Sequence, residues 1–321
     1  MPCTFTHALF SEEIYKNIKD FCDFEDLKTF SQGPDPFSFY NLVNIKSGEK
    51  YRTLGSYIQN NKTKDFFINL ITYIKTNNLQ NNKQVMSFLY GFICHYYLDK
   101  TTHPYIIYKS GKFNLKDKKT YKYNNKHHEV EVYIDNYFIH NYKLKNYKKF
   151  KIHEFSFNNK PFSKELQETI DKTFYNTYKI KYISKIYEKS LKQMKNFYKY
   201  FRYDTTKIKK ILYSIIDFIT PIQIPKLKIT SYNVILNNNS YYLNLDKKIW
   251  NHPTNKFETY NYSFNELYLI SKKDCLYAIK EVNRVLYENK TIKILDKVFL
   301  NLSYSTNKDC KLKFKKQYFE K

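Results

Sequence analysis

Histidine and carboxylate side chains recur at four-residue intervals in two stretches of this chain. These side chains are His95, Asp99 and His103 in the first stretch, and His127, Glu131 and Asp135 in the second. Residues four apart lie on one face of an α-helix, so each stretch predicts a helix that presents its ligand-type side chains in one direction. Buried imidazoles and carboxylates need partners, and zinc ions supply them. The spacing therefore predicts a helical protein with a zinc site between helices.

Neighbouring residues limit this arrangement. Pro104 directly follows His103 and is expected to end or kink the first helix. His128 lies about 100° around the helix from its neighbour and is expected to support a ligand or to face solvent. Glu129 and His140 are expected at the surface.

Apolar residues recur with a helical period along most of the chain. This periodicity predicts helices at 6–21, 65–76, 84–101, 127–142, 164–177, 183–201, 206–218, 263–287 and 292–302. Residues 109–126 are polar and predict a connecting loop, and a short irregular or β insert is expected near 226–245. We predict an all-α fold, a single multi-helix bundle over residues 1–321, with a motif-bearing core at about 1–145 and a C-terminal helical part at about 160–305.

The chain carries a formal net charge of +25, which favours anionic partners. Its arginines, however, are only Arg52, Arg202 and Arg284, and arginine is the usual residue for bidentate phosphate and base recognition. Nucleic acid is therefore a disfavoured partner, whereas peripheral contact with an anionic membrane stays open. The odd number of cysteines, five, contains no close pair. With no signal-like or membrane-spanning stretch, a cytoplasmic location is expected.

Two residues near the N-terminus could join the site. Asp35 lies between two prolines in Gly-Pro-Asp-Pro, a rigid loop suited to holding a metal-binding carboxylate, and His7 opens the first predicted helix. No serine or cysteine has the neighbours of a nucleophile–base pair, and no glycine-rich phosphate loop is present. Metal-activated water is therefore the expected chemistry, with Asp99 as the candidate bridge between ions.

Five segments together resemble the zinc-dependent phospholipase C family, which is related to the fungal single-strand nucleases. These segments are Thr6-His7, Gln32-Gly-Pro-Asp35, Gly91–Asp99, Thr102-His103-Pro104 and His127–Glu131. More narrowly, the chain resembles the short cytosolic bacterial branch, described as phospholipase C/D domain proteins. Trp250-Asn-His-Pro253 and Ser263–Tyr268 are also similar to that branch.

The resemblance implies an all-α fold with up to three zinc ions and hydrolysis of a phospholipid or other phosphodiester by an activated water. It implies His7 at an N-terminal zinc, Asp35 and His95 at a second, Asp99 at the bridge, and His103, His127 and Glu131 at the third. It also places Asp35 where it could orient or deprotonate the attacking water, the catalytic role.

The chain departs from the family pattern at two places. Gln59 stands where the family has a ligand histidine, and an amide is a poorer zinc ligand than imidazole. Two outcomes are expected there: Gln59 binds zinc weakly through its carbonyl oxygen, or one metal is missing. The chain also begins Met1-Pro2, whereas the secreted enzymes use a freed N-terminal tryptophan as a ligand. Three interpretations therefore remain: an active phosphodiester hydrolase, a catalytically impaired zinc-binding relative, and a single-strand nuclease-like hydrolase.

Overall fold

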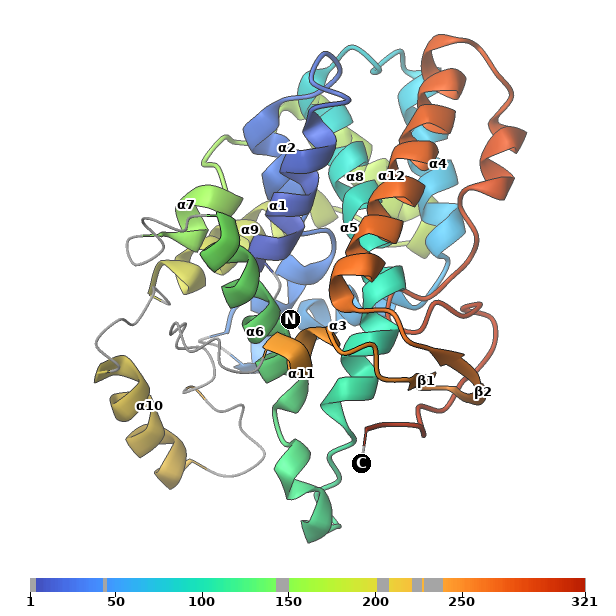
Figure 1. Ribbon diagram of the computed structural model, residues 1–321. Coiled ribbons are helices and arrows are strands. Elements are labelled where there is room, and N and C mark those ends of the chain that lie inside the picture. Colours follow the sequence, from blue (N-terminus) through green and yellow to red (C-terminus); the bar gives the residue numbers. More distant parts are fainter. Residues whose placement is uncertain are drawn as a thin grey trace.

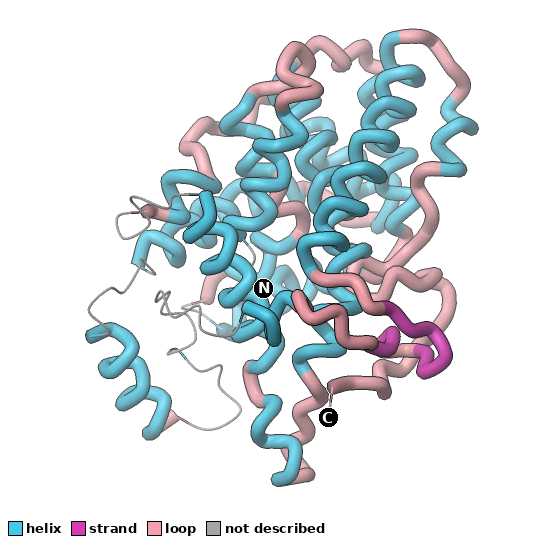
Figure 2. The backbone as a smooth tube through the Cα atoms, viewed as in Figure 1, coloured by secondary structure: helices cyan, strands magenta, loops and turns pink. Residues whose placement is uncertain are grey.

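Helices form most of this protein, whose computed structural model describes residues 4–42, 45–142, 150–200, 208–220, 227 and 239–320 (Figures 1 and 2). The α-helices are α1 (Thr4–Tyr15), α2 (Phe24–Phe30), α3 (Ile45–Gln59), α4 (Thr63–Thr76), α5 (Lys83–Ser110), α6 (Lys126–Tyr142), α7 (Ile152–Ser156), α8 (Lys164–Tyr178), α9 (Ile183–Tyr200), α10 (Ile208–Ile219), α11 (Asn239–Leu243) and α12 (Phe264–Tyr287). Short 3-10 helices are η1 (Asp35–Phe39), η2 (Lys118–Tyr123) and η5 (Ile292–Lys297), and the strands are β1 (Trp250–His252) and β2 (Asn255–Tyr260). The predicted all-α fold class with a short β insert is confirmed.

The 28-residue helix α5 is the centre of the packing. It contacts α12, α2, α6 and α1, and Figure 1 shows α12 running beside it. Asn82 caps its start, since the side-chain oxygen accepts hydrogen bonds from the amides of Gln84 and Val85. Apolar side chains on all sides of α5 are buried, so this helix runs through the hydrophobic interior. His95 and Asp99, which lie on it, are therefore buried as well.

Helix α5 does not end at Pro104, one of the two outcomes that the sequence predicts there. It continues to Ser110, so Pro104 lies inside it. A proline within a helix removes a backbone hydrogen bond and costs about 3 kcal/mol. The side chains of Tyr105 and Ile106, directly after it, are 0% and 1% exposed. Burial of these two side chains offsets the cost of the proline and keeps the helix continuous.

A buried carboxylate joins α1 to α6. Asp135 of α6 accepts hydrogen bonds from the Thr6 hydroxyl at 2.6 Å, the Thr6 amide at 2.9 Å and the Phe5 amide at 3.2 Å. These donors belong to the first turn of α1, where backbone amides have no partner within the helix. The contact therefore sets where His7, one residue further on, enters the interior.

The two-stranded sheet lies against the later half of α5. Strands β1 and β2 pair antiparallel, with Trp250 opposite Tyr260 and a register irregularity at Asn251 and His252. The Trp250 ring packs on Tyr105 of α5, with ring centroids 5.4 Å apart. The insert predicted near 226–245 falls largely outside the described residues, and the residues described there include the short helix α11.

Most predicted helices are confirmed with small shifts of their ends, and residues 201, 206 and 207 lie outside the described part. The helix predicted over 6–21 ends at Tyr15, and the one predicted over 292–302 is the 3-10 helix η5. The sequence did not predict α2, α3 or α7, and the loop predicted over 109–126 contains the end of α5 and the 3-10 helix η2. Helix α3 contains two glycines, which lower helix propensity by about 1 kcal/mol each. None of the described helices is long and apolar enough to cross a membrane.

Helices α2 and α5 approach each other closely at Gly91. A Cβ added there would lie 2.6 Å from the Phe30 carbonyl carbon. We expect Gly91→Ala to lower the free energy of unfolding by about 1–3 kcal/mol through overpacking, although alanine favours helix. Urea denaturation measures the change. Lys280→Ala, at an exposed position of α12, should stay within about 0.5 kcal/mol of the parent protein, and an equal loss in both variants would contradict the close-approach argument.

Candidate metal centre

Asp99 of α5 lies among three imidazoles. Its Oδ1 is 3.2 Å from His7 Nε2 and 3.2 Å from His103 Nδ1, and its Oδ2 is 3.0 Å from His95 Nε2. His95 and His103 lie one turn before and one turn after it on α5, as the four-residue spacing predicts. The third imidazole, His7, comes from α1. Asp99 therefore faces ligand-type groups on two sides.

On one side of Asp99, three side chains form a group with metal-ligand geometry. His7, Asp35 and His95 each offer one ligand atom, and these atoms lie within 4.8 Å of one another. All three side chains are buried, and the rings of His7 and His95 stack with centroids 4.2 Å apart. The distant segments α1, η1 and α5 thus meet at one point.

Backbone contacts of the loop before η1 hold His95 in place. His95 Nδ1 lies 3.0 Å from the carbonyl oxygen of Ser31, which leaves Nε2 directed at the carboxylates. Gly33 has a positive φ of 51°, and a Cβ there would come within 2.4 Å of the His95 ring. The Tyr187 hydroxyl donates to the Gly33 carbonyl at 2.8 Å. The glycine of Gly-Pro-Asp-Pro is therefore required both by the turn and by the imidazole packed against it.

On the other side of Asp99, His103, His127 and Glu131 form a second group whose ligand atoms lie within 4.8 Å of one another. Glu131 Oε1 is 3.3 Å from His103 Nε2 and 3.1 Å from His127 Nε2. His127 Nδ1 lies 3.2 Å from the Ser110 hydroxyl. The His103 and His127 side chains are 16% and 42% exposed, so this group opens toward solvent whereas the first does not.

His7 Nδ1 is buried and has no hydrogen-bond partner within the described residues. His95 Nε2, Asp99 Oδ2 and His103 Nδ1 are also buried, and their polar contacts are the imidazole–carboxylate pairs around Asp99. Buried polar atoms are nearly always hydrogen-bonded, and one without a partner costs about 1–3 kcal/mol. Imidazole nitrogens and carboxylate oxygens are also the donor set that zinc prefers. The residues present therefore fit zinc ions.

The charges at the site are strongly coupled. Burial alone would raise the pKa of Asp99, but the imidazoles of His103, His95 and His7 outweigh burial and hold its pKa well below the usual range. Burial would lower the pKa of His103, yet Asp99 and Glu131 raise it to about 10. The pKa of His103 therefore lies above neutral pH, and a metal ion bound there would displace its proton.

Gln59, at the end of α3, contacts the site through Asp35. Its side-chain amide nitrogen donates a 2.8 Å hydrogen bond to Asp35 Oδ1, and Gln59 is itself buried. An amide NH₂ group cannot bind a metal ion. In this arrangement Gln59 orients the Asp35 carboxylate through its amide nitrogen.

Asp135 does not continue the ligand series of α6. It repeats the four-residue spacing after His127 and Glu131, but its carboxylate caps α1 and belongs to neither described ligand group. Burial raises the pKa of Asp135 to about 7 against the opposing hydrogen bonds from Thr6. His128 is also outside both groups, and burial lowers its pKa to about 3. Periodicity alone could not separate Asp135 from the ligands, because its partners lie on another helix.

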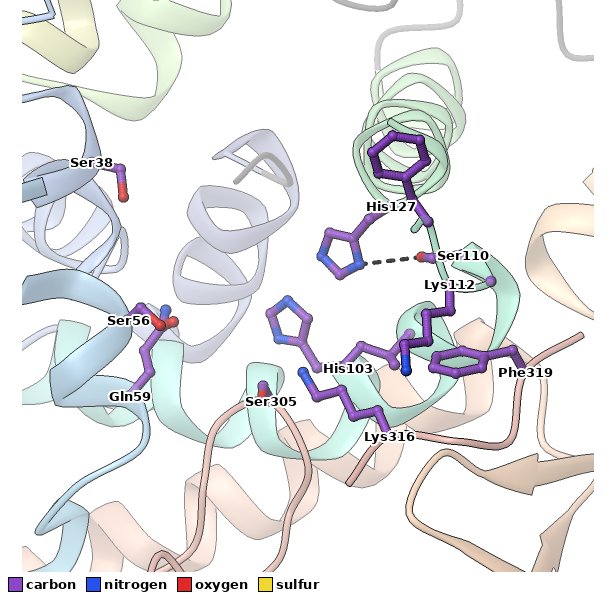
Figure 3. Close-up of a pocket in the computed structure, with 13 residues that line it drawn as sticks. Ser38, Ser56, Gln59, His103, Ser110, Lys112, His127, Ser305, Lys316 and Phe319 are labelled. Atoms are coloured by element: carbon purple, nitrogen blue, oxygen red, sulfur yellow. Dashed lines mark hydrogen bonds between the residues drawn. The ribbon is translucent and has the colours of Figure 1, made fainter. Parts of the chain in front are cut away.

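A cavity of about 570 Å³ adjoins the second group (Figure 3). Its lining includes His103 and His127, with Gln59 on the far side. Lys112 and Lys316 also line it, and sequence analysis did not identify them. Lys316 is remote from the motifs in sequence, so only the fold brings it here. The second metal-ligand group is therefore accessible to a small molecule.

Comparisons with curated proteins and with solved structures gave no match. The model of the family described as zinc dependent phospholipase C matches residues 6–184. This match covers more than half of the 321 residues and includes Asp99 and both ligand groups. Together with the predicted resemblance and the geometry of the site, it shows that the chain belongs to the zinc-dependent phospholipase C family.

Proposed function

We propose that this protein is a zinc-dependent phosphodiester hydrolase that acts on phospholipids through a metal-activated water. The proposal rests on the position of Asp99, whose carboxylate contacts histidines of both ligand groups. A carboxylate between two ligand groups suits a site in which neighbouring ions share one bridge. The family supplies the reaction class, and the cavity beside the second group supplies access for a substrate.

In this proposal His7, Asp35 and His95 would hold one zinc ion, and His103, His127 and Glu131 would hold another. Asp99, which faces both groups, is the candidate bridging ligand. The two described groups support two ions, and the family resemblance sets an upper number of three. When bound, zinc would lower the pKa of a water and stabilise charge on a phosphoryl oxygen.

The chain's own contribution to proton transfer is assigned to Asp35. Burial raises the pKa of Asp35, partly offset by His95. Gln59 occupies one of its oxygens through a hydrogen bond, which fixes the direction of the carboxylate. Asp35 would therefore orient the attacking water and accept its proton, with Gln59 as a positioning residue.

One observation favours the alternative of a catalytically impaired relative. The Gln59 amide nitrogen donates to Asp35, so no imidazole stands at residue 59 and the first group has three His or Asp ligands. Zinc bound with fewer ligands would have lower occupancy. The nuclease-like alternative gains no specific support from the described residues.

The proposal also covers the domain organisation, the location and the membrane contact of the protein. We treat residues 1–321 as one domain, because α12, outside the matched region, packs along α5. Cys22, Cys94, Cys275 and Cys310 are free thiols, which suits a cytoplasmic location. Peripheral contact with an anionic membrane is supported by exposed apolar side chains on α10, such as Phe218.

Metal content and hydrolysis together test the proposed function. We expect purified protein to hold at least two zinc ions per chain by elemental analysis and to hydrolyse bis(p-nitrophenyl) phosphate and a short-chain phosphatidylcholine. Treatment with a chelator should abolish hydrolysis, and added zinc should restore it. A zinc-loaded protein that hydrolyses neither substrate would contradict the proposal and favour the impaired relative.

Asp99→Asn should disrupt the bridge. The amide keeps the shape of the side chain but removes the charge that the surrounding imidazoles stabilise. We expect the variant to lose at least one zinc ion per chain and at least about 100-fold in rate. His128→Ala, outside both groups, should keep its zinc. Loss of more zinc from His128→Ala than from Asp99→Asn would show that the ligand assignment is wrong.

Gln59→His tests whether residue 59 is a degraded ligand position. A histidine there would add an imidazole beside Asp35, and we expect zinc occupancy and the hydrolysis rate to rise together. Gln59→Leu is the matched control, since it removes the hydrogen bond to Asp35 without adding a ligand. Unchanged zinc content in Gln59→His would show that the position is not part of a metal site.

A further inference from the structure

Among the described residues, the lining of the cavity beside the second ligand group includes two lysines and no carboxylate. Lys112 and Lys316 both contribute to its lining. In Figure 3 the two lysine side chains lie on the side of the cavity where His103 is found, across from Gln59 and Ser56. The space next to the candidate metal centre is therefore positively charged.

Lys316 belongs to an extended segment, residues 311–320, that we call the strap. Specific contacts hold the strap in place. The amides of Gln317 and Tyr318 donate to the Pro253 carbonyl at 2.8 and 3.1 Å. Glu320 then accepts an ion pair from Lys109 of α5 at 2.6 Å. Lys316 is thus fixed at the cavity by anchors that immediately follow it in the chain.

The Lys316 ammonium group makes no hydrogen bond or ion pair within the part of the chain that the structure describes. Its side chain is only partly exposed, and burial lowers its pKa. A partly buried cation without a partner is unfavourable, and an anion in the cavity would supply that partner. Lys112 is exposed at the same cavity and adds a second cation.

The remaining lining suits an organic molecule that carries such an anion. Ile107, Phe113 and Phe319 provide apolar walls, and Ser56 and Ser305 provide hydroxyl groups. A volume of about 570 Å³ is within the range of small-molecule sites. A headgroup that carries a positive charge would lie beside two ammonium groups, which repel it.

We propose that this cavity binds a phospholipid headgroup that carries its own phosphate, with Lys112 and Lys316 pairing with that phosphate while the scissile phosphodiester lies at the zinc-ligand groups. This inference rests on the proposed function and names its substrate class. It assigns a specificity role to the strap, which lies outside the part of the chain that the family model matches.

The kinetic test compares two water-soluble substrates, dihexanoyl phosphatidylinositol 4-phosphate and dihexanoyl phosphatidylcholine, each below its micelle concentration. We expect the zinc-loaded protein to have a kcat/KM at least about tenfold higher for the phosphorylated headgroup. Lys316→Met should lower this preference by about tenfold, since one charge-assisted pair is lost, and Lys112→Met should lower it less. The preference is the ratio of the two kcat/KM values, so a variant that loses activity equally on both substrates keeps the same preference.

Lys315→Met is the matched control. Lys315 is the exposed neighbour of Lys316 on the strap and does not line the cavity, so this variant removes the same net charge. It should keep the preference of the parent protein. An equal loss in Lys315→Met and Lys316→Met would assign the preference to overall charge and overturn the proposed site.

A binding measurement separates failure of this inference from failure of the proposed function. Calorimetry on the zinc-loaded protein gives the Kd of the expected product headgroups, inositol 1,4-bisphosphate and phosphocholine. We expect tighter binding of the bisphosphate and a loss of about tenfold in Lys316→Met. If binding behaves so but no substrate is hydrolysed, the cavity assignment holds and the hydrolase proposal fails. If both substrates are hydrolysed with no preference and the Kd does not depend on Lys316, the cavity assignment fails alone.

Discussion

The buried carboxylate of Asp99, enclosed by three imidazoles, is the interaction on which the site depends. A carboxylate that is 3% exposed is costly unless positive charge or metal compensates it, and here the compensating groups come from α1 and α5. Two of the imidazoles lie on the buried helix α5. The hydrogen bonds from Thr6 to Asp135 hold the start of α1 against α6, so that His7 lies beside the same carboxylate.

Much of this arrangement was predictable because it is local. His95, Asp99 and His103 share a face of one helix, so their spacing alone predicts their convergence. The meeting of Asp35 with His95 could be expected only through the family resemblance, since η1 and α5 are distant in sequence. The same periodicity led to the wrong role for Asp135. Its partners are backbone amides of α1, and the spacing of residues along α6 contains no information about contacts with another helix.

The features that could not be predicted depend on tertiary placement. Lys316 faces the cavity because the strap is anchored to Pro253 and to α5, contacts between segments more than sixty residues apart. Pro104 has a strong local tendency to end a helix, but burial of the residues after it prevails. Local pattern therefore indicates which side chains could act together, whereas packing decides which of them do.

The two ligand groups differ in their access to water, and this difference has a consequence for metal exchange. His7, Asp35 and His95 are enclosed by the interior, whereas His127 lies at the open cavity. An ion held at the enclosed group would exchange more slowly than one held at the open group, because solvent reaches only the open group directly. If both groups hold zinc, a slow chelator would therefore empty the open group first.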